Sequence, residues 1–365
     1  MKEAHPDLPK GKEKRKKPIS INYYQSPSVF IFMKTIIKLL FTIALLFAVF
    51  ISNAKPLEKI SVKGKDIVTE SGKVIRLKGV SFSDPDKLEK NGQWNKRYFQ
   101  EAKNWGCNIV RFAVHPTALN SRGWDAYFEL VDKGVNWATE LEMYVIIDWH
   151  SIGNLNTEKF SNKMYNTSMA ETVKFWQTVS KRYKGNSTVA VYELFNEPTN
   201  ESGKLGELSW GTWKPTLEKL IDEIAKIDSE KIYLVAGMNW GYFLDEVLEN
   251  PVNRKNVAYS SHPYPQKREK PWEPQWEKDW GHVADKYPII ATEFGFMGAD
   301  ERGAHIPCIS DESYGEAIMN YFEKKGISYT LWCFDPHWPP TLITDWNFTP
   351  SRQGKFFKEV LLKKD

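Results

Sequence analysis

The sequence is poor in cysteine and lacks the usual spacings of protein metal ligands. Its 365 residues include only Cys107, Cys308 and Cys333, which excludes a disulfide-stapled scaffold and matches no zinc-binding pattern. The His-x-His pair of many metal-dependent barrel hydrolases is also absent, so we expect neither a metal nor another cofactor. Cys308 and Cys333 are candidates for a disulfide in an oxidising compartment, and the sequence leaves their pairing open.

Low-complexity linkers and Pro-, Ser- or Thr-rich hinges are missing after residue 54. We therefore expect residues 55–365 to form a single domain. Hydrophobic residues make up 41% of the chain and charged residues 26%, which is ordinary for a globular protein and excludes global disorder.

A basic surface is missing from this domain as well. The net charge of +4 comes from residues 1–54, where nine Lys or Arg stand against three acids. Residues 55–365 carry 41 basic and 43 acidic residues, so we expect no nucleic-acid partner.

Residues 33–54 have the three parts of a secretory signal peptide. Lys34 and Lys38 supply the positive n-region, Leu39–Ile51 form an apolar run, and Ser52–Ala54 place small residues at a cleavage site. The apolar run is shorter than the ~20 residues that a spanning helix needs. A membrane anchor is therefore the less favoured alternative.

The segment before the signal peptide, residues 1–32, is a polar and basic N-terminal extension. Met33 is a candidate for the true start, because the signal peptide is complete from that residue onward. We predict a secreted protein, extracellular or periplasmic, whose mature chain begins near Lys55.

After residue 54 the chain alternates between strand-like and helix-like segments. Eight apolar runs rich in β-branched residues occur at 74–82, 108–114, 144–150, 189–197, 231–237, 257–263, 288–295 and 329–334. Helix-like stretches separate them, including 124–143, 166–184, 210–228 and 311–325. Several runs are apolar throughout, which is typical of parallel strands covered by helices. The alternation predicts an α/β fold, a (β/α)8 (TIM) barrel.

A doubly wound sheet is the alternative fold. It would place a Gly-rich phosphate-binding turn after the first strand, and the sequence there, at 81–86, is SFSDPD. Ahead of that strand, we expect Ile60–Lys73 to form a short β-hairpin with its turn at Glu70–Gly72. This hairpin would close the bottom of the barrel.

Polar side chains gather where the predicted strands end, which is where this fold carries its catalytic groups. The strand ends hold Arg111 and His115, Asp148 and His150, Asn196 and Glu197, His262 and Tyr264, Glu293, and Trp332. A purely structural barrel has no need for two glutamates, three histidines and an arginine at one rim. We therefore predict an active site there.

Glu197 and Glu293 end the fourth and seventh predicted strands and so face each other across the barrel mouth. Cleavage of a glycosidic bond needs two carboxyl groups, one to protonate the leaving oxygen and one to attack or to activate water. We expect Arg111 and Tyr264 to keep Glu293 ionised. A less cationic and more apolar setting, together with the negative charge on Glu293, is expected to keep Glu197 protonated.

Six short motifs resemble glycoside hydrolase family 5, the cellulase and mannanase family of retaining barrel enzymes. They are RFAV at 111–114, DWH at 148–150, LFNEP at 194–198, HPY at 262–264, TEFG at 292–295 and LW at 331–332. The resemblance covers most of residues 57–360 and implies that residues 55–365 are a catalytic barrel. By position it implies that Glu197 is the acid/base and Glu293 the nucleophile. It implies supporting roles for Arg111, His150, Asn196, His262, Tyr264 and Trp332.

Aromatic residues make up 14% of the chain and include 15 Trp, more than a core alone needs. We expect Trp332 to stack on a pyranose ring and Asn196 to bind a sugar 2-hydroxyl. His115, Trp338 and Trp346 are further candidates for substrate binding. The spacing of Trp272, Trp276 and Trp280 favours one buried helix face, whereas Trp240 is open between packing and substrate binding.

The resemblance implies a retaining endo-glycosidase of plant polysaccharide, with an endo-β-1,4-glucanase (cellulase) as the leading expectation. An endo-β-1,4-mannanase or a xyloglucanase uses the same machinery with different rim loops and stays open. The alternative from another class is a non-catalytic carbohydrate-binding protein, against which the presence of both glutamates argues. We expect a monomer whose partner is a β-linked polysaccharide or oligosaccharide, with no stable membrane anchor after signal cleavage.

Overall fold

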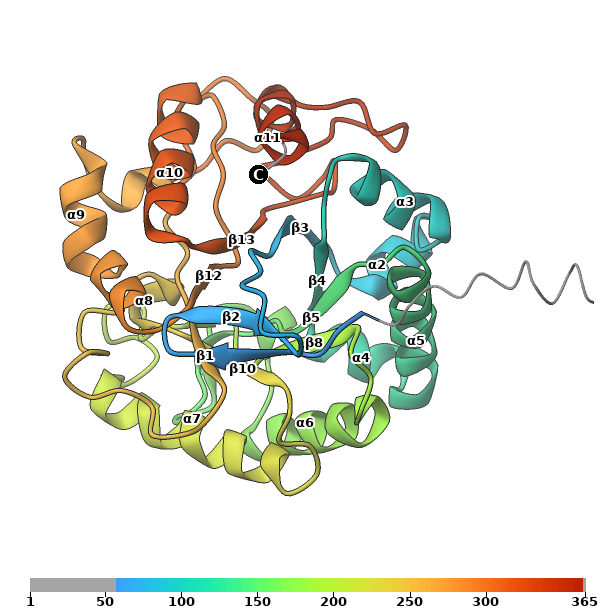
Figure 1. Ribbon diagram of the computed structural model, residues 1–365, viewed down its shortest axis with the longest axis vertical. Coiled ribbons are helices and arrows are strands. Elements are labelled where there is room, and N and C mark those ends of the chain that lie inside the picture. Colours follow the sequence, from blue (N-terminus) through green and yellow to red (C-terminus); the bar gives the residue numbers. More distant parts are fainter. Residues whose placement is uncertain (1–56, 364–365) are drawn as a thin grey trace, which may run out of the picture. The chain divides into compact units, whose positions relative to one another are not determined.

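The computed structural model describes residues 57–363 (Figure 1). The predicted N-terminal extension and signal peptide lie outside the described residues. Within residues 57–363, no helix is both long enough and apolar enough to cross a membrane.

Eight parallel strands close into a barrel, which confirms the predicted fold class. The strands follow one another around the barrel in chain order, and the last pairs with the first. They are β3 (Lys78–Phe82), β4 (Ile109–Val114), β5 (Tyr144–Trp149), β8 (Val189–Glu193), β10 (Ile232–Ala236), β11 (Val257–Ser260), β12 (Ile289–Ala291) and β13 (Ser328–Leu331). Each strand lies inside or within one residue of a predicted apolar run, because both of its faces are buried.

Helices surround the barrel on the outside (Figure 1). They are α2 (Pro85–Lys90), α3 (Lys96–Asn104), α4 (Pro116–Arg122), α5 (Trp124–Glu140), α6 (Met169–Tyr183), α7 (Trp210–Ala225), α8 (Met238–Gly241), α9 (Trp272–Asp279), α10 (Glu312–Lys325) and α11 (Arg352–Leu362). Local sequence sets several ends. The Ser168 side chain caps the start of α6, Asp311 caps α10, and Gly326 ends α10 in the left-handed conformation.

The hairpin at the bottom of the barrel is present, but the predicted turn position was wrong. Strands β1 (Ile60–Lys63) and β2 (Asp66–Thr69) are joined at Gly64 and Lys65, and Gly64 has the positive φ that such a tight turn requires. The segment Glu70–Gly72 forms a second turn, after β2. Figure 1 shows the hairpin crossing the ring of strands.

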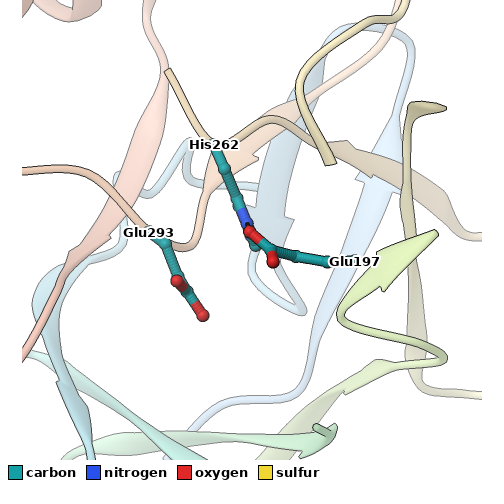
Figure 2. Close-up of side chains that lie close together, drawn as sticks. All are labelled: Glu197, His262 and Glu293. Carbon is teal, nitrogen blue, oxygen red and sulfur yellow. Dashed lines mark hydrogen bonds and ion pairs between the residues drawn. The ribbon is translucent and has the colours of Figure 1, made fainter. Parts of the chain in front are cut away.

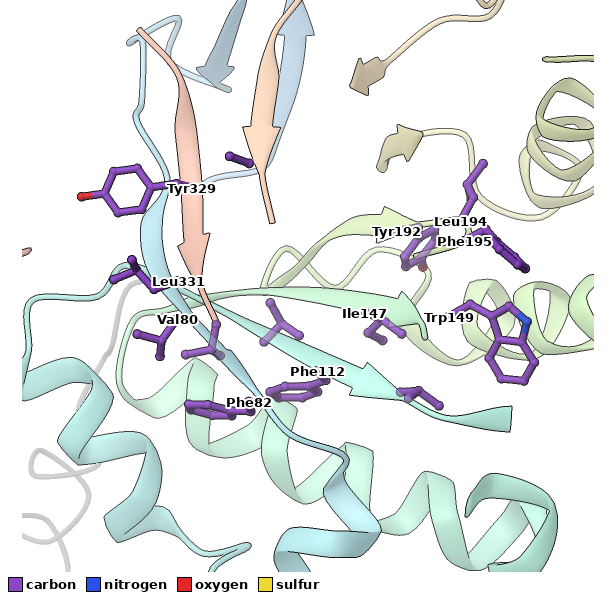
Figure 3. Packing of buried hydrophobic residues seen from close by; sticks show 14 of the residues in the cluster. Val80, Phe82, Phe112, Ile147, Trp149, Tyr192, Leu194, Phe195, Tyr329 and Leu331 are labelled. Carbon is purple, nitrogen blue, oxygen red and sulfur yellow. The ribbon is translucent and has the colours of Figure 1, made fainter. Parts of the chain in front are cut away.

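The main core lies between the strands and the helices. Phe82 and Phe112 project from neighbouring strands toward the helices (Figure 3), with ring centroids 6.1 Å apart. Most tryptophans belong to this layer, including the predicted helix face of Trp272, Trp276 and Trp280, which is buried. The Trp content therefore serves packing more than binding.

The candidate disulfide between Cys308 and Cys333 does not form, and all three cysteines are buried free thiols. The two sulfurs have different partners. Cys333 Sγ donates to the Ser81 carbonyl at 3.5 Å, while Cys308 Sγ lies 3.6 Å from His305 Nε2.

Gly134 lies in the middle of α5, where helix propensity favours alanine by about 1 kcal/mol. A Cβ at this position would lie 2.4 Å from Trp94 Cζ2 and 3.1 Å from Phe112 Cε2. The indole N–H of Trp94 donates a hydrogen bond to the Leu130 carbonyl at 2.8 Å, which fixes the ring in this position. We therefore expect Gly134→Ala to destabilise the fold by about 1–3 kcal/mol, measured as a lower Tm.

The matched control is Gly211→Ala in α7, where the nearest atom to the added Cβ is 3.8 Å away. This variant should keep or raise the Tm. A Gly134→Ala protein at least as stable as the parent would contradict the packing of α5 against Trp94.

Candidate active site

The carboxyl ends of the barrel strands bring the predicted polar residues together at one cleft, which Glu197 and Glu293 line and near which Arg111 and His262 are fully buried. Arg111 lies within β4, His150 follows β5, His262 follows β11, and Glu293 follows β12. Glu197 begins the short strand β9 (Glu197–Pro198), which pairs with β6 (Ile152–Asn154) beyond the end of β5. The cleft has a volume of about 840 Å³.

Arg111 is fully buried and holds several of these groups together. Its Nε lies 2.5 Å from Glu193 Oε2, its Nη1 lies 3.1 Å from Glu293 Oε1, and its Nη2 lies 2.9 Å from Asp148 Oδ2. Nη2 also donates to Asn196 Oδ1 at 2.6 Å. Burial alone lowers the pKa of Arg111, but the three carboxylates outweigh it and raise the pKa. The guanidinium therefore stays charged.

Glu197 and Glu293 reach toward each other with little solvent exposure, 9% and 6%. Each places one carboxylate oxygen within 4.8 Å of the other and of a His262 ring nitrogen. Figure 2 shows the three side chains projecting from different segments into one space. A sugar bound in the cleft can thus contact both carboxyl groups.

The surroundings of Glu197 differ from the sequence-based expectation. His262 Nδ1 lies 2.9 Å from Glu197 Oε1. Burial lowers the pKa of His262, but Glu293, Glu193 and Glu197 outweigh it and raise the pKa to about 9. His262 is therefore a cation at neutral pH, so Glu197 has a charged neighbour that was not expected, while Glu293 is influenced by both His262 and Arg111. The charge arises from carboxylates on three other segments, which no local pattern reveals.

Glu293 has the two contacts that were expected for it. Arg111 donates to its Oε1, and the Tyr264 hydroxyl donates to its Oε2 at 3.1 Å. Burial nevertheless raises the pKa of the Glu293 carboxyl above its ordinary value, while His262 and Arg111 oppose that effect. The charges of His262 and Arg111 thus limit the rise in the Glu293 pKa that burial causes.

Only one of the two polar atoms of the Asn196 side-chain amide has a hydrogen-bond partner among the described residues. Its Oδ1 accepts from Arg111, whereas its Nδ2 is buried with no hydrogen-bond partner among the described residues. A buried donor without a partner is costly. Asn196 directly precedes Glu197, which lines the cleft.

Three rings form one wall of the cleft. His150 and Trp332 lie parallel, with centroids 5.3 Å apart, and Trp338 stacks on Trp332 at 5.9 Å. Burial, with His115 and Arg111, lowers the pKa of His150 well below its ordinary value. His150 Nδ1 lies 2.6 Å from Asp148 Oδ2, and burial raises the pKa of the Asp148 carboxyl well above its usual range.

The remaining predicted binding residues lie differently. His115 packs against His150 and Trp338, with its Nε2 buried and unpaired among the described residues. Trp346 does not line the cleft, because it packs against Tyr98 and His337.

Several residues of the site had no role assigned from the sequence. Asp148 and Glu193 are buried carboxyl groups beneath the cleft, and Lys267 lines its wall together with Trp240, which the sequence left open between packing and substrate binding. The signal for Glu193 is a charge inside the otherwise apolar strand VAVYE. Trp240 lies in the one-turn helix α8 and Lys267 in a short 3₁₀ turn, and the sequence carries no comparable signal for either.

The cluster of Glu197, His262 and Glu293 also offers three potential metal ligands. A ligating histidine must be neutral, but the raised pKa keeps His262 protonated. Both of its ring nitrogens are engaged, one by Glu197 and the other by Thr292 Oγ1 at 2.9 Å. The arrangement suits proton transfer better than metal binding, and the metal-free reaction stays a prediction.

The family model for cellulases, glycosyl hydrolase family 5, matches residues 68–337. The chain belongs to glycosyl hydrolase family 5. Curated relatives include endoglucanase A of Butyrivibrio fibrisolvens, 26% identical over 75% of this chain, and an endoglucanase of Clostridium saccharobutylicum, 27% identical over 82%. The matches span 59% and 64% of those two proteins.

A solved family 5 structure is also similar along nearly its whole length. The β-glucanase SdGluc5_26A from Saccharophagus degradans is 47% identical, with a TM-score of 0.83, and the match covers 84% of this chain and 94% of that one. A second structure of that β-glucanase holds cellotetraose.

The contact between Tyr264 and Glu293 predicts a pH effect. Tyr264→Phe removes a hydrogen bond to the ionised carboxylate, which disfavours that form, so the pKa of Glu293 should rise further. We expect the acidic limb of kcat/KM for glycoside hydrolysis to move upward by about one pH unit. A pH–rate profile measures the shift.

Tyr233→Phe is the matched control, because the Tyr233 hydroxyl donates to the Asp228 carbonyl at the opposite end of the barrel. Its acidic limb should stay in place. If the acidic limb of kcat/KM stays in place in Tyr264→Phe, the Tyr264 hydroxyl does not affect the pKa of Glu293.

Proposed function

We propose that this protein is a retaining endo-β-1,4-glucanase. The observation that carries the proposal is the pair of carboxyl groups with oxygens within 4.8 Å, because retaining glycosidases hold theirs about 5–5.5 Å apart and inverting ones hold theirs farther apart. The unlike partners of the pair suit two different roles. Glu293, beside Arg111 and Tyr264, is the nucleophile, and Glu197, beside His262, is the acid/base.

In the first step, Glu293 attacks the anomeric carbon while Glu197 gives its proton to the departing glycosidic oxygen. The carbon–oxygen bond to the leaving sugar breaks, and a glycosyl ester forms on Glu293. Glu197 becomes a carboxylate at this point, and the protonated His262 that faces it stabilises the new charge.

In the second step, the Glu197 carboxylate takes a proton from water, whose oxygen attacks the anomeric carbon and releases Glu293. Each step inverts the anomeric centre, so the product keeps the configuration of the substrate.

Asn196 and Trp332 are proposed to hold the sugar during these steps. The open Nδ2 of Asn196 suits the sugar 2-hydroxyl, to which hydrogen bonds strengthen in the transition state. Trp332 presents its ring to the cleft beside His150 and suits the apolar face of a pyranose. Trp338 extends this wall, and His115 packs against Trp338.

The names of the relatives favour glucan as the substrate. The curated relatives above are endoglucanases, and the similar β-glucanase binds cellotetraose. An endo-β-1,4-mannanase or a xyloglucanase would use the same carboxylates, and comparing rates on carboxymethylcellulose, mannan and xyloglucan separates these alternatives. A non-catalytic carbohydrate-binding protein would not need the unlike partners of Glu197 and Glu293.

We further propose that residues 33–54 direct secretion and are removed, which leaves residues 55–365 as the mature catalytic domain. The n-region, apolar run and small cleavage residues of the sequence support this. The mature protein is proposed to act as a monomer on a polysaccharide or oligosaccharide. The near balance of charge in residues 55–365 gives no support for a nucleic-acid partner.

Substitution of each of the two glutamates by alanine should impair a different step of the reaction. Glu293→Ala removes the nucleophile, so no glycosyl ester forms, and azide can attack from the vacated face to give an inverted glycosyl azide. Glu197→Ala keeps the nucleophile but loses proton donation, so substrates with good leaving groups should still form the ester. Mass spectrometry of the protein and of the azide products distinguishes the two outcomes.

Glu201→Ala is the control, because Glu201 lies outside the cleft lining. It should retain parental activity. Identical responses of Glu197→Ala and Glu293→Ala to activated substrates and azide would contradict the assigned roles.

A further inference from the structure

Lys267 brings an ammonium group into the cleft on the side of the proposed proton donor. It ends the short 3₁₀ turn Pro265–Lys267, which follows β11, and it lines the cleft with Glu197. Burial lowers the pKa of the Lys267 ammonium, and the nearby Glu197 carboxylate opposes that effect. The lysine therefore acts at close range on whatever occupies this side of the cleft.

The ammonium has unused capacity for hydrogen bonds. Its one acceptor in the described part of the chain is the Asn239 carbonyl, at 3.4 Å, and no ion pair joins it to a carboxylate there. The group otherwise lies over the rings of Trp240 and Tyr242, 5.3 Å and 5.9 Å from their centroids. An ammonium has three donors, so two remain for a ligand.

The turn beneath Lys267 fixes its place beside Glu197. Asn239 and Trp240 both adopt left-handed conformations, with φ of 56° and 55°, which are unfavourable for residues other than glycine. Their helix α8 packs against β9, which carries Glu197. The Gly241 carbonyl accepts from the His262 backbone N–H at 2.9 Å. The turn is thus tied to the two groups that handle the proton.

We propose that Lys267 donates hydrogen bonds to hydroxyl groups of the sugar on the leaving-group side of the cleaved bond. This inference rests on the proposed function, because Glu197 faces the leaving group only if it is the proton donor. The ligand is a neutral sugar rather than a uronic acid, since a further carboxylate would approach Glu197 and Glu293. Lys267 is accordingly a specificity residue for the departing sugar and for any sugar that replaces water in the second step.

The test uses the complete mature enzyme, residues 55–365, with β-cellobiosyl fluoride as donor and cellobiose as acceptor. Glu293 attacks the anomeric carbon, the carbon–fluorine bond breaks, and fluoride leaves without a sugar on the leaving-group side. A cellobiose hydroxyl or water then attacks the ester, its proton passes to Glu197, and the bond to Glu293 breaks. The ratio of transfer product to hydrolysis product reports acceptor binding alone, because both routes use the same base.

For Lys267→Met we expect unchanged fluoride release and a transfer-to-hydrolysis ratio lowered about tenfold, which corresponds to about 1.4 kcal/mol. Lys267→Gln keeps a neutral donor and should lose less. The matched control is Lys270→Met, since Lys270 lies over the Trp272 ring at 4.6 Å and bonds to Ser313 outside the cleft lining. It should leave the ratio unchanged.

An unchanged ratio in Lys267→Met, with transfer intact in the parent enzyme, would overturn the inference and leave the proposed function standing. Equal losses in fluoride release and in transfer would also overturn it, because they indicate a general structural defect. A parent enzyme that turns over neither the fluoride nor β-1,4-glucan would overturn both proposals.

Discussion

Arg111 lies fully buried in the barrel, where its guanidinium contacts Glu193, Asp148, Glu293 and Asn196. Removing one partner from a buried cluster of this kind is strongly destabilising, because it leaves a charge uncompensated. The contacting groups come from different strands and meet only when the barrel closes in this register. The same contacts that satisfy Arg111 also place the proposed nucleophile and the amide that precedes the proposed acid.

Chemistry at this site depends on unlike surroundings for two identical side chains. Glu293 receives a permanent cation and a phenol, whereas Glu197 receives an imidazolium whose charge depends on nearby carboxylates. His262 also connects through Thr292 to Glu193, which accepts from the Thr292 hydroxyl at 2.6 Å. A change of charge at Glu197 is therefore coupled through hydrogen bonds to the cluster around Arg111.

The positions of the strands could be predicted because a strand that is buried on both faces appears in the sequence as an apolar run. The active site could be predicted because the carboxyl ends of all eight parallel strands meet at one rim of the barrel. Features that depend on residues brought together only by folding could not be predicted. The hairpin turn lies at Gly64 rather than at Glu70–Gly72, since two glycine-containing turns follow each other closely. The charge of His262 depends on residues of other strands. Lys267 and Trp240 lie in short turns that follow β11 and β10, where neither periodicity nor strand order places a side chain.

The most direct test of the account follows the anomeric configuration of the first product. Digestion of cellotetraose by the mature enzyme, monitored by proton NMR before mutarotation, shows which anomer appears first. Double displacement by Glu293 and Glu197 predicts the β-anomer at the newly formed reducing end. Initial release of the α-anomer, or no cleavage of cellotetraose, would contradict a retaining β-1,4-glucanase.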